Sequence, residues 1–286
     1  MFTPTVDEKA MQITLVSLLE SENKIELANI IRMSKVVYSP QWDFSGIVSN
    51  QRKLYVEIKV PVNLKKIARE NVQVLSDYCN EIYENDEVYA CCGVIIGTRA
   101  IIAEVVEFEN KVLLLEKDSV YTNLIKHLSA DTKVDSLQKK YLYEACTTGN
   151  EGNILAASVM LGCAAELLLK KLCDSFYLYY KNNHTQKEQD TFEQKVIKAK
   201  TAYIRLDEFT KRAEANAELF KSFGFENLKL NFNFLDIIRQ TRNDAGHPTG
   251  KNLEESEFKT MLGNYQLSLG KYLTAIENLP IIKVNQ

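Results

Sequence analysis

Apolar and polar residues alternate over residues 53–60 of the chain. The apolar members are every second residue: Leu54, Val56, Ile58 and Val60. A period of two predicts a strand with one buried face, and Pro61 is expected to end it because proline cannot donate a hydrogen bond within a sheet. Further β-branched runs predict three more strands, over 88–96, 101–108 and 112–115, with a short hairpin connection at 109–111.

The same half of the chain also contains segments in which apolar residues recur at helical spacing. Apolar positions three or four residues apart predict helices over 11–20, 24–33 and 64–83. A sheet of three or four strands packed against helices is therefore the expected fold of an α+β domain over residues 1–130. The chain becomes polar over 129–138, and we expect the boundary to a second domain there.

The rest of the chain has helical patterns throughout. Helices are predicted over 138–147, 154–177, one or two within 191–220, then 232–244 and 253–276. The segment 154–177 is apolar nearly all round, which predicts the central helix of a bundle. Gly149 is the expected end of the first helix, and Asn252 with Glu255 predicts a capping box at the start of the last. We therefore expect an all-α domain over 136–286.

Composition and charge narrow the classes of protein. A chain of 286 residues with 45% hydrophobic residues and 5 Pro suits two globular domains. Its net charge of −3 argues against a large duplex-binding surface, although 35 Lys and Arg leave room for a small basic pocket. A secretory leader is not apparent, and the apolar run 154–169 is shorter than the roughly 20 residues that cross a bilayer. A cytoplasmic protein without a membrane segment is expected, with reduced cysteines.

The segment 237–248 contains the candidate chemistry. Arg242 continues the apolar face of the predicted helix 232–244, so its charge needs a partner. Glu166, on the central predicted helix, is the candidate partner; the alternative is that Arg242 caps the C-terminal end of its own helix. Gly246 offers a left-handed position that would end the helix, and Pro248 prevents its continuation. His247 would then fold back beside Arg242, because residues five apart on a straight helix differ by about 140° in direction.

This motif resembles the signature of the HEPN family. In that signature a polar residue directly follows an arginine, and a histidine lies four to six residues after the arginine. Arg242, Asn243 and His247 fill the three positions. The alanine-rich segment 143–169 is similar to the first two helices of many HEPN domains. The resemblance covers about half of the chain and implies an all-α HEPN-like helical bundle that acts as a homodimer, with RNA as substrate.

The resemblance implies that the protein is a metal-independent ribonuclease that needs no cofactor. Arg242 would bind the scissile phosphate, His247 would transfer protons, and Asn243 would position them; Glu166 and Asp244 are expected as supporting residues. Arginine is a planar, permanently charged fork that suits phosphate, and histidine exchanges protons near neutral pH. A two-fold dimer would supply the second histidine, since one is too few for a separate acid and base.

The N-terminal half is similar to an α+β module joined to HEPN-type effectors in bacterial abortive-infection proteins. The likeness rests on three stretches, 34–38, 42–46 and 54–61. It implies a sensing or regulatory module, and hence a bacterial effector of antiviral defence, of abortive-infection or toxin type, whose regulatory protein or antitoxin the sequence does not identify. The alternative is a non-catalytic HEPN-like module for dimerisation or for binding RNA, nucleotide or protein, in which Arg242 is structural.

Overall fold

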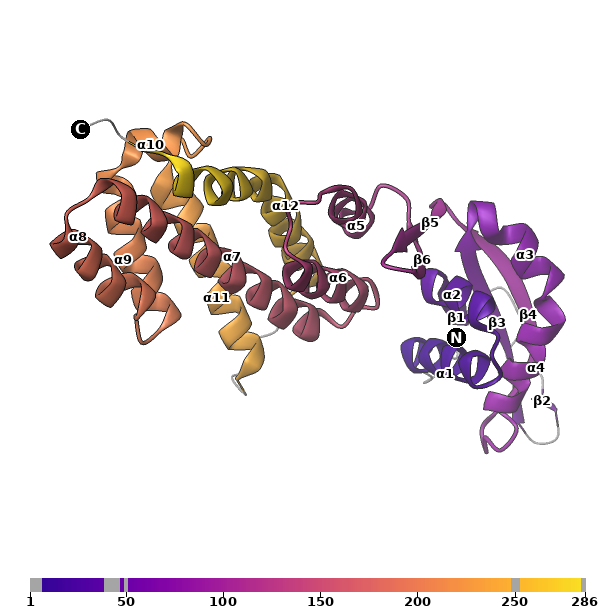
Figure 1. Cartoon of the computed structure of the whole chain (residues 1–286). Coiled ribbons are helices and arrows are strands. Elements are labelled where there is room, and N and C mark those ends of the chain that lie inside the picture. Colours follow the sequence, from indigo (N-terminus) through magenta and orange to yellow (C-terminus); the bar gives the residue numbers. More distant parts are fainter. Residues whose placement is uncertain (1–6, 39–46, 49–50, 248–252, 284–286) are drawn as a thin grey trace. The chain divides into compact units, whose positions relative to one another are not determined.

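The computed structural model describes residues 7–38, 47–48, 51–247 and 253–283 (Figure 1). The chain divides into an N-terminal unit, Met1–Thr122, and a C-terminal unit, Asn123–Gln286. The N-terminal unit combines helices with strands, and the C-terminal unit is helical. Helix α5, Val120–Ala130, begins at this division; the sequence pattern did not predict it.

The helices of the N-terminal unit follow the predicted positions with one exception. Helices α1, Glu8–Ser21, and α2, Ile25–Met33, are both confirmed. The single helix predicted over 64–83 is instead two, α3 at Lys65–Glu70 and α4 at Val72–Ile82. The break falls at Asn71, whose side-chain amide donates to the carbonyl of Ile67 at 2.9 Å. Such a side-chain bond to the backbone competes with the helix.

The sheet is built around β3, Gln51–Pro61, which contains the predicted alternating strand. Antiparallel partners are β1, Lys35–Tyr38, and β2, Ile47–Val48, while β4, Tyr89–Arg99, pairs in parallel. Leu54, Val56, Ile58 and Val60 are fully buried, at 0% exposure, which confirms the buried face. The register shifts between Leu54 and Tyr55 and leaves Cys92 without a residue opposite it in β3.

The outer part of the N-terminal unit differs from the single sheet that was predicted. Strands β5, Ala103–Phe108, and β6, Lys111–Glu116, form a separate two-stranded sheet. Glu109 and Asn110 connect them with positive φ angles of 45° and 66°, the backbone of a two-residue hairpin turn. The prediction of one sheet was therefore wrong, because alternation reveals which face of a strand is buried but not which strand is its neighbour.

In the C-terminal unit the helices surround α7, Ile154–Asn183. Helices α6, Ser136–Asn150, α11, Leu228–Gly246, and α12, Glu255–Asn278, all pack against it, which confirms the predicted central helix. Shorter elements complete the unit: α8, Gln186–Phe192, a π-helical turn at Glu193–Ile197, α9, Ala202–Ala215, α10, Ala217–Lys221, and a final 3-10 turn at Leu279–Ile281.

Two predicted helix ends need correction. Gly149 is buried inside α6 rather than ending it, and the left-handed backbone belongs to Gly152, at φ 81°. The capping box of α12 is formed by Glu254 and Glu257. The predicted first partner, Asn252, lies outside the described residues. In both cases the pattern located the helix but not the residue that satisfies its end.

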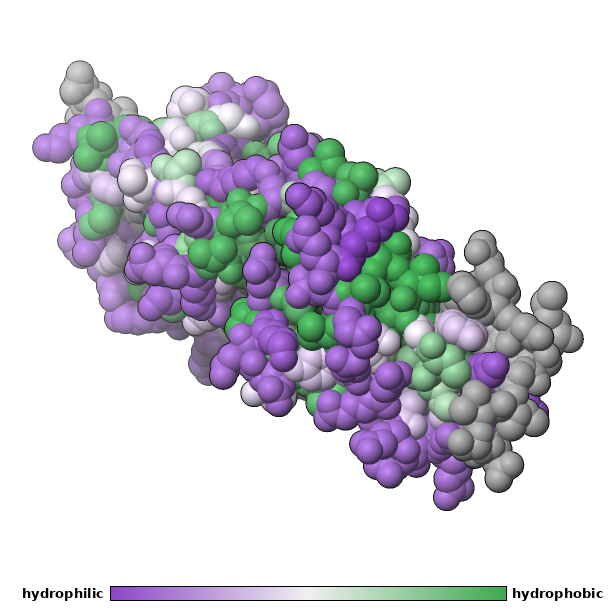
Figure 2. Space-filling view, turned by 90° about the vertical axis from the view of Figure 1, so that its right-hand side faces the viewer, coloured by the Kyte–Doolittle hydropathy of each residue, from purple (hydrophilic) through white to green (hydrophobic). Residues whose placement is uncertain are grey.

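Hydrophobic residues gather in a few patches on the mainly hydrophilic face that Figure 2 shows. Among the described residues, no helix combines the length and the apolar character needed to cross a membrane.

Candidate functional site

Helix α11 carries the predicted motif, and it ends where the motif ends. Gly246 is its last helical residue, and His247 leaves the helix with an extended backbone, φ −111° and ψ 148°. Gly246 is not among the glycines with positive φ, so the prediction of a left-handed glycine was wrong. The extended conformation of His247 is the one favoured by a residue that precedes proline, and residue 248 is Pro248. Pro248 itself lies outside the described residues.

Arg242 forms an ion pair with Glu166 of α7, in which its Nη2 donates to the carboxylate Oε1. The predicted partner is therefore confirmed. Each of the two side chains is 32% exposed, so the pair is half-buried rather than sealed in the core. The Arg242 Nε is buried and has no hydrogen-bond partner in the described part of the chain. The guanidinium is thus held from one side by a carboxylate and remains accessible to solvent.

Gly162 explains how Arg242 reaches Glu166. A Cβ added at Gly162 would lie 2.3 Å from Cβ and 2.4 Å from Cγ of Arg242. The first carbons of the arginine therefore lie directly on the α7 backbone, in a space that exists because residue 162 has no side chain. Glu166 follows Gly162 by four residues, on the same face of the helix, where it meets the guanidinium. This role of Gly162 was not predicted from the sequence.

The other two residues of the motif are not joined to this ion pair. His247 is exposed and Asn243 is half-buried. Across the ranges that the structure describes, no hydrogen bond or ion pair connects either of them to Arg242. The structure thus brings together Arg242 and Glu166, and it places His247 just beyond the helix end, five residues further along the chain.

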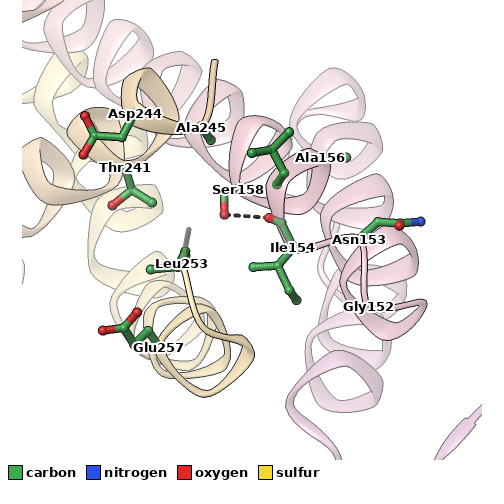
Figure 3. A pocket seen from close by; sticks show the side chains of 11 residues that line it. Gly152, Asn153, Ile154, Ala156, Ser158, Thr241, Asp244, Ala245, Leu253 and Glu257 are labelled. Carbon is green, nitrogen blue, oxygen red and sulfur yellow. Dashed lines mark hydrogen bonds between the residues drawn. The ribbon is translucent and has the colours of Figure 1, made fainter. Parts of the chain in front are cut away.

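A pocket of about 790 Å³ lies between the start of α7, the end of α11 and the start of α12. Its apolar lining comes from all three segments: Ile154, Leu155, Ala156, Ala245 and Leu253. Figure 3 shows Ile154 and Ser158 on one side of the space and Thr241 and Leu253 on the other. Sequence reasoning missed this pocket, because three helix ends far apart in the chain form it.

Polar groups of the same pocket come from Asn153, Ser158, Thr241, Asp244 and Glu257. The Ser158 hydroxyl donates to the carbonyl of Ile154 at 2.8 Å (Figure 3). The Glu257 carboxylate accepts from the backbone N–H of Glu254 at 3.1 Å, as part of the α12 capping box. Asp244, expected as a supporting residue, lines this pocket; it lies two residues past Arg242 and therefore on a different face of α11. None of the lining residues that the structure describes is basic.

The chain thus consists of an α+β unit followed by a helical unit. The helical unit contains an ion-paired arginine on α11 and a pocket formed by the ends of three helices. No protein-family model, no curated protein and no solved structure matches the chain.

Proposed function

We propose that the C-terminal unit is a metal-independent endoribonuclease of the HEPN type. One observation carries the proposal: a guanidinium that is ion-paired and 32% exposed lies near the end of α11, and the exposed His247 follows just past that end. An accessible arginine and an accessible histidine on one short segment are the two groups that phosphodiester cleavage through a 2′-hydroxyl requires.

The residues divide the work by chemical type. Glu166 holds one side of the Arg242 guanidinium, so that its remaining donors can bind the scissile phosphate and stabilise charge that develops there. His247 accepts the proton of the RNA 2′-hydroxyl as the O2′–P bond forms. His247 of a second copy donates a proton to the 5′-oxygen as the P–O5′ bond breaks. The homodimer therefore supplies the two imidazoles that one chain lacks, and Asn243 positions the phosphate or the imidazole.

In this proposal the chain is a cytoplasmic bacterial effector of antiviral defence, of abortive-infection or toxin type. The N-terminal unit, with its own buried core, regulates the C-terminal unit.

The second candidate is a non-catalytic HEPN-like module for dimerisation or for binding RNA, nucleotide or protein. The packing of Arg242 on Gly162 favours it, since such a contact also fits a purely structural arginine. Under this hypothesis Arg242→Ala removes packing and an ion pair but no activity. Because both partners are 32% exposed, we expect the ion pair to contribute about 1 kcal/mol or less to stability.

The test uses the purified full chain with total bacterial RNA in the presence of EDTA. We expect the wild type to cut the RNA, and His247→Ala to be inactive while keeping its helical circular dichroism. His127→Ala is the matched control, because it removes a 38% exposed imidazole from α5; it is expected to cut at the wild-type rate. Cleavage by His247→Ala at the wild-type rate would overturn the assignment of His247. Intact RNA with the wild type, together with normal growth of bacteria that express it, would favour the non-catalytic module.

A further inference from the structure

The pocket at the start of α7 lies next to the ion-paired arginine, which suggests what it binds. We infer that it receives the guanine base of an RNA nucleotide whose phosphate is held by Arg242. The inference rests on the proposed function and deepens it, because it names a base preference that the Arg–His motif does not.

Position is the first argument. Ser158 lines the pocket, and Gly162, which carries the stem of Arg242, lies four residues later on α7. Four residues of α-helix span about 6 Å. On α11 the pocket residue Thr241 is the direct neighbour of Arg242. The Arg242 guanidinium itself reaches on to Glu166, eight residues or about 12 Å of helix past Ser158. An extended nucleotide can therefore place its base in the pocket while its phosphate contacts the guanidinium.

Size and lining favour a nucleoside over a bare phosphate. The volume of about 790 Å³ is in the range of small-molecule sites, roughly 300–1,000 Å³. Apolar walls from Ile154, Leu155 and Leu253 suit the flat faces of a base. The described part of the lining contains two carboxylates and no Lys, Arg or His, so these residues would repel an anion inside the pocket. The phosphate belongs outside it, at Arg242.

The carboxylates select the base. Asp244 of α11 and Glu257 of α12 both line the pocket, and Figure 3 shows them apart from one another, with Thr241 between them, so each carboxylate offers a separate acceptor. An ionised carboxylate only accepts hydrogen bonds. Guanine presents two adjacent donors, N1–H and the 2-amino group, which match the two oxygens of a carboxylate. Adenine and cytosine place an acceptor nitrogen beside their amino group, and uracil places carbonyls on both sides of its single N–H. These bases set acceptors against the carboxylate, which costs affinity.

The experiment measures binding of guanosine, adenosine, cytidine and uridine to the full chain by isothermal titration calorimetry. Free nucleosides carry no phosphate, so the measurement does not depend on Arg242 or on cleavage. Guanosine is expected to bind at least about tenfold more tightly than the other three. Glu257→Gln is expected to abolish this preference, and because glutamine also serves in a capping box, the start of α12 is retained.

Glu255→Gln is the matched control. Glu255 lies in the same first turn of α12, pairs with Lys259 at 2.7 Å and does not line the pocket; its substitution should leave the guanosine preference unchanged. Equal binding of all four nucleosides, binding of none, or a preference that survives Glu257→Gln would overturn the inference. Guanosine binding without any RNA cleavage would instead keep the pocket assignment and reject the nuclease proposal. Cleavage without guanosine binding would do the reverse.

Discussion

Replacing Gly162 with alanine is expected to destabilise the C-terminal unit, although alanine normally stabilises a helix interior by about 1 kcal/mol relative to glycine. The added Cβ would lie 2.3 Å from the Cβ of Arg242. That carbon is attached to the α11 backbone and cannot rotate away. The two helices must therefore separate, or α11 must shift along α7.

The magnitude follows from the size of the overlap. Non-bonded carbons are comfortable at about 3.5–4.0 Å, so the helices must open by more than 1 Å at this point. Overpacking of this kind costs about 1–3 kcal/mol. We expect a cost at the upper end of this range, because the overlap is deep and the Arg242 Cβ is bonded to the main chain. A cost of about 3 kcal/mol less a propensity gain of about 1 kcal/mol leaves a net loss of about 2 kcal/mol.

Urea unfolding followed by far-ultraviolet circular dichroism measures this loss as a lower midpoint. The control is Gly270→Ala, because Gly270 is exposed within α12 and a Cβ there meets nothing within 4 Å. That variant should gain about 1 kcal/mol, so the two midpoints are expected to shift in opposite directions. A Gly162→Ala midpoint that rises together with that of Gly270→Ala would refute the close approach of α7 and α11.

Two further predictions concern pH. Asp135 pairs with Lys171 at 2.8 Å and also caps α6 by accepting from the N–H of Leu137 at 2.9 Å; both contacts lower the pKa of its carboxyl, and Lys171 contributes most. Asp135→Ala should cost about 1 kcal/mol at pH 7. Its contribution is present above the unfolded pKa of about 3.9 and is lost as pH falls through the lower folded pKa, so the wild-type and Asp135→Ala urea midpoints should converge at low pH. Burial raises the pKa of Tyr83 to about 12, against about 10 when unfolded. The contribution of the neutral Tyr83 side chain to the stability of the N-terminal unit should therefore be complete below pH 10 and be lost between about pH 10 and 12. The Tyr83→Phe variant should lose less stability over this range. Equal losses of stability in the wild type and the variant would contradict this prediction.

The sequence predicted best where one face of an element is buried. The alternation over 53–60 and the apolar character of 154–177 led directly to β3 and to the central helix α7. Strands β1 and β2 were not predicted, because four and two residues are too few to establish a period. The break at Asn71 was missed for a different reason: apolar residues continue at helical spacing across it, while a local side-chain hydrogen bond interrupts the backbone.

For the candidate site, the partner of Arg242 could be predicted because a charge on an apolar face requires compensation, and Glu166 is an acidic residue within the most buried segment. Gly162 could not, since a glycine in an apolar helix has no pattern that distinguishes a contact point from an ordinary small residue. The end of α11 was predicted within two residues, at 244 instead of Gly246, but for the wrong reason. Gly246 was credited with a left-handed turn, whereas the extended His247 precedes a proline.

The sheet leaves one consequence for handling the protein. Within the described residues β4 pairs only with β3, and residues 89–98 of this strand contain no charged side chain. Natural edge strands usually carry lysine, proline or a bulge that discourages further pairing; here the shift at Cys92 is the one such interruption. We therefore expect copies at high concentration to add edge to edge. A lysine at an exposed position of β4 is accordingly the first change to make when a preparation precipitates.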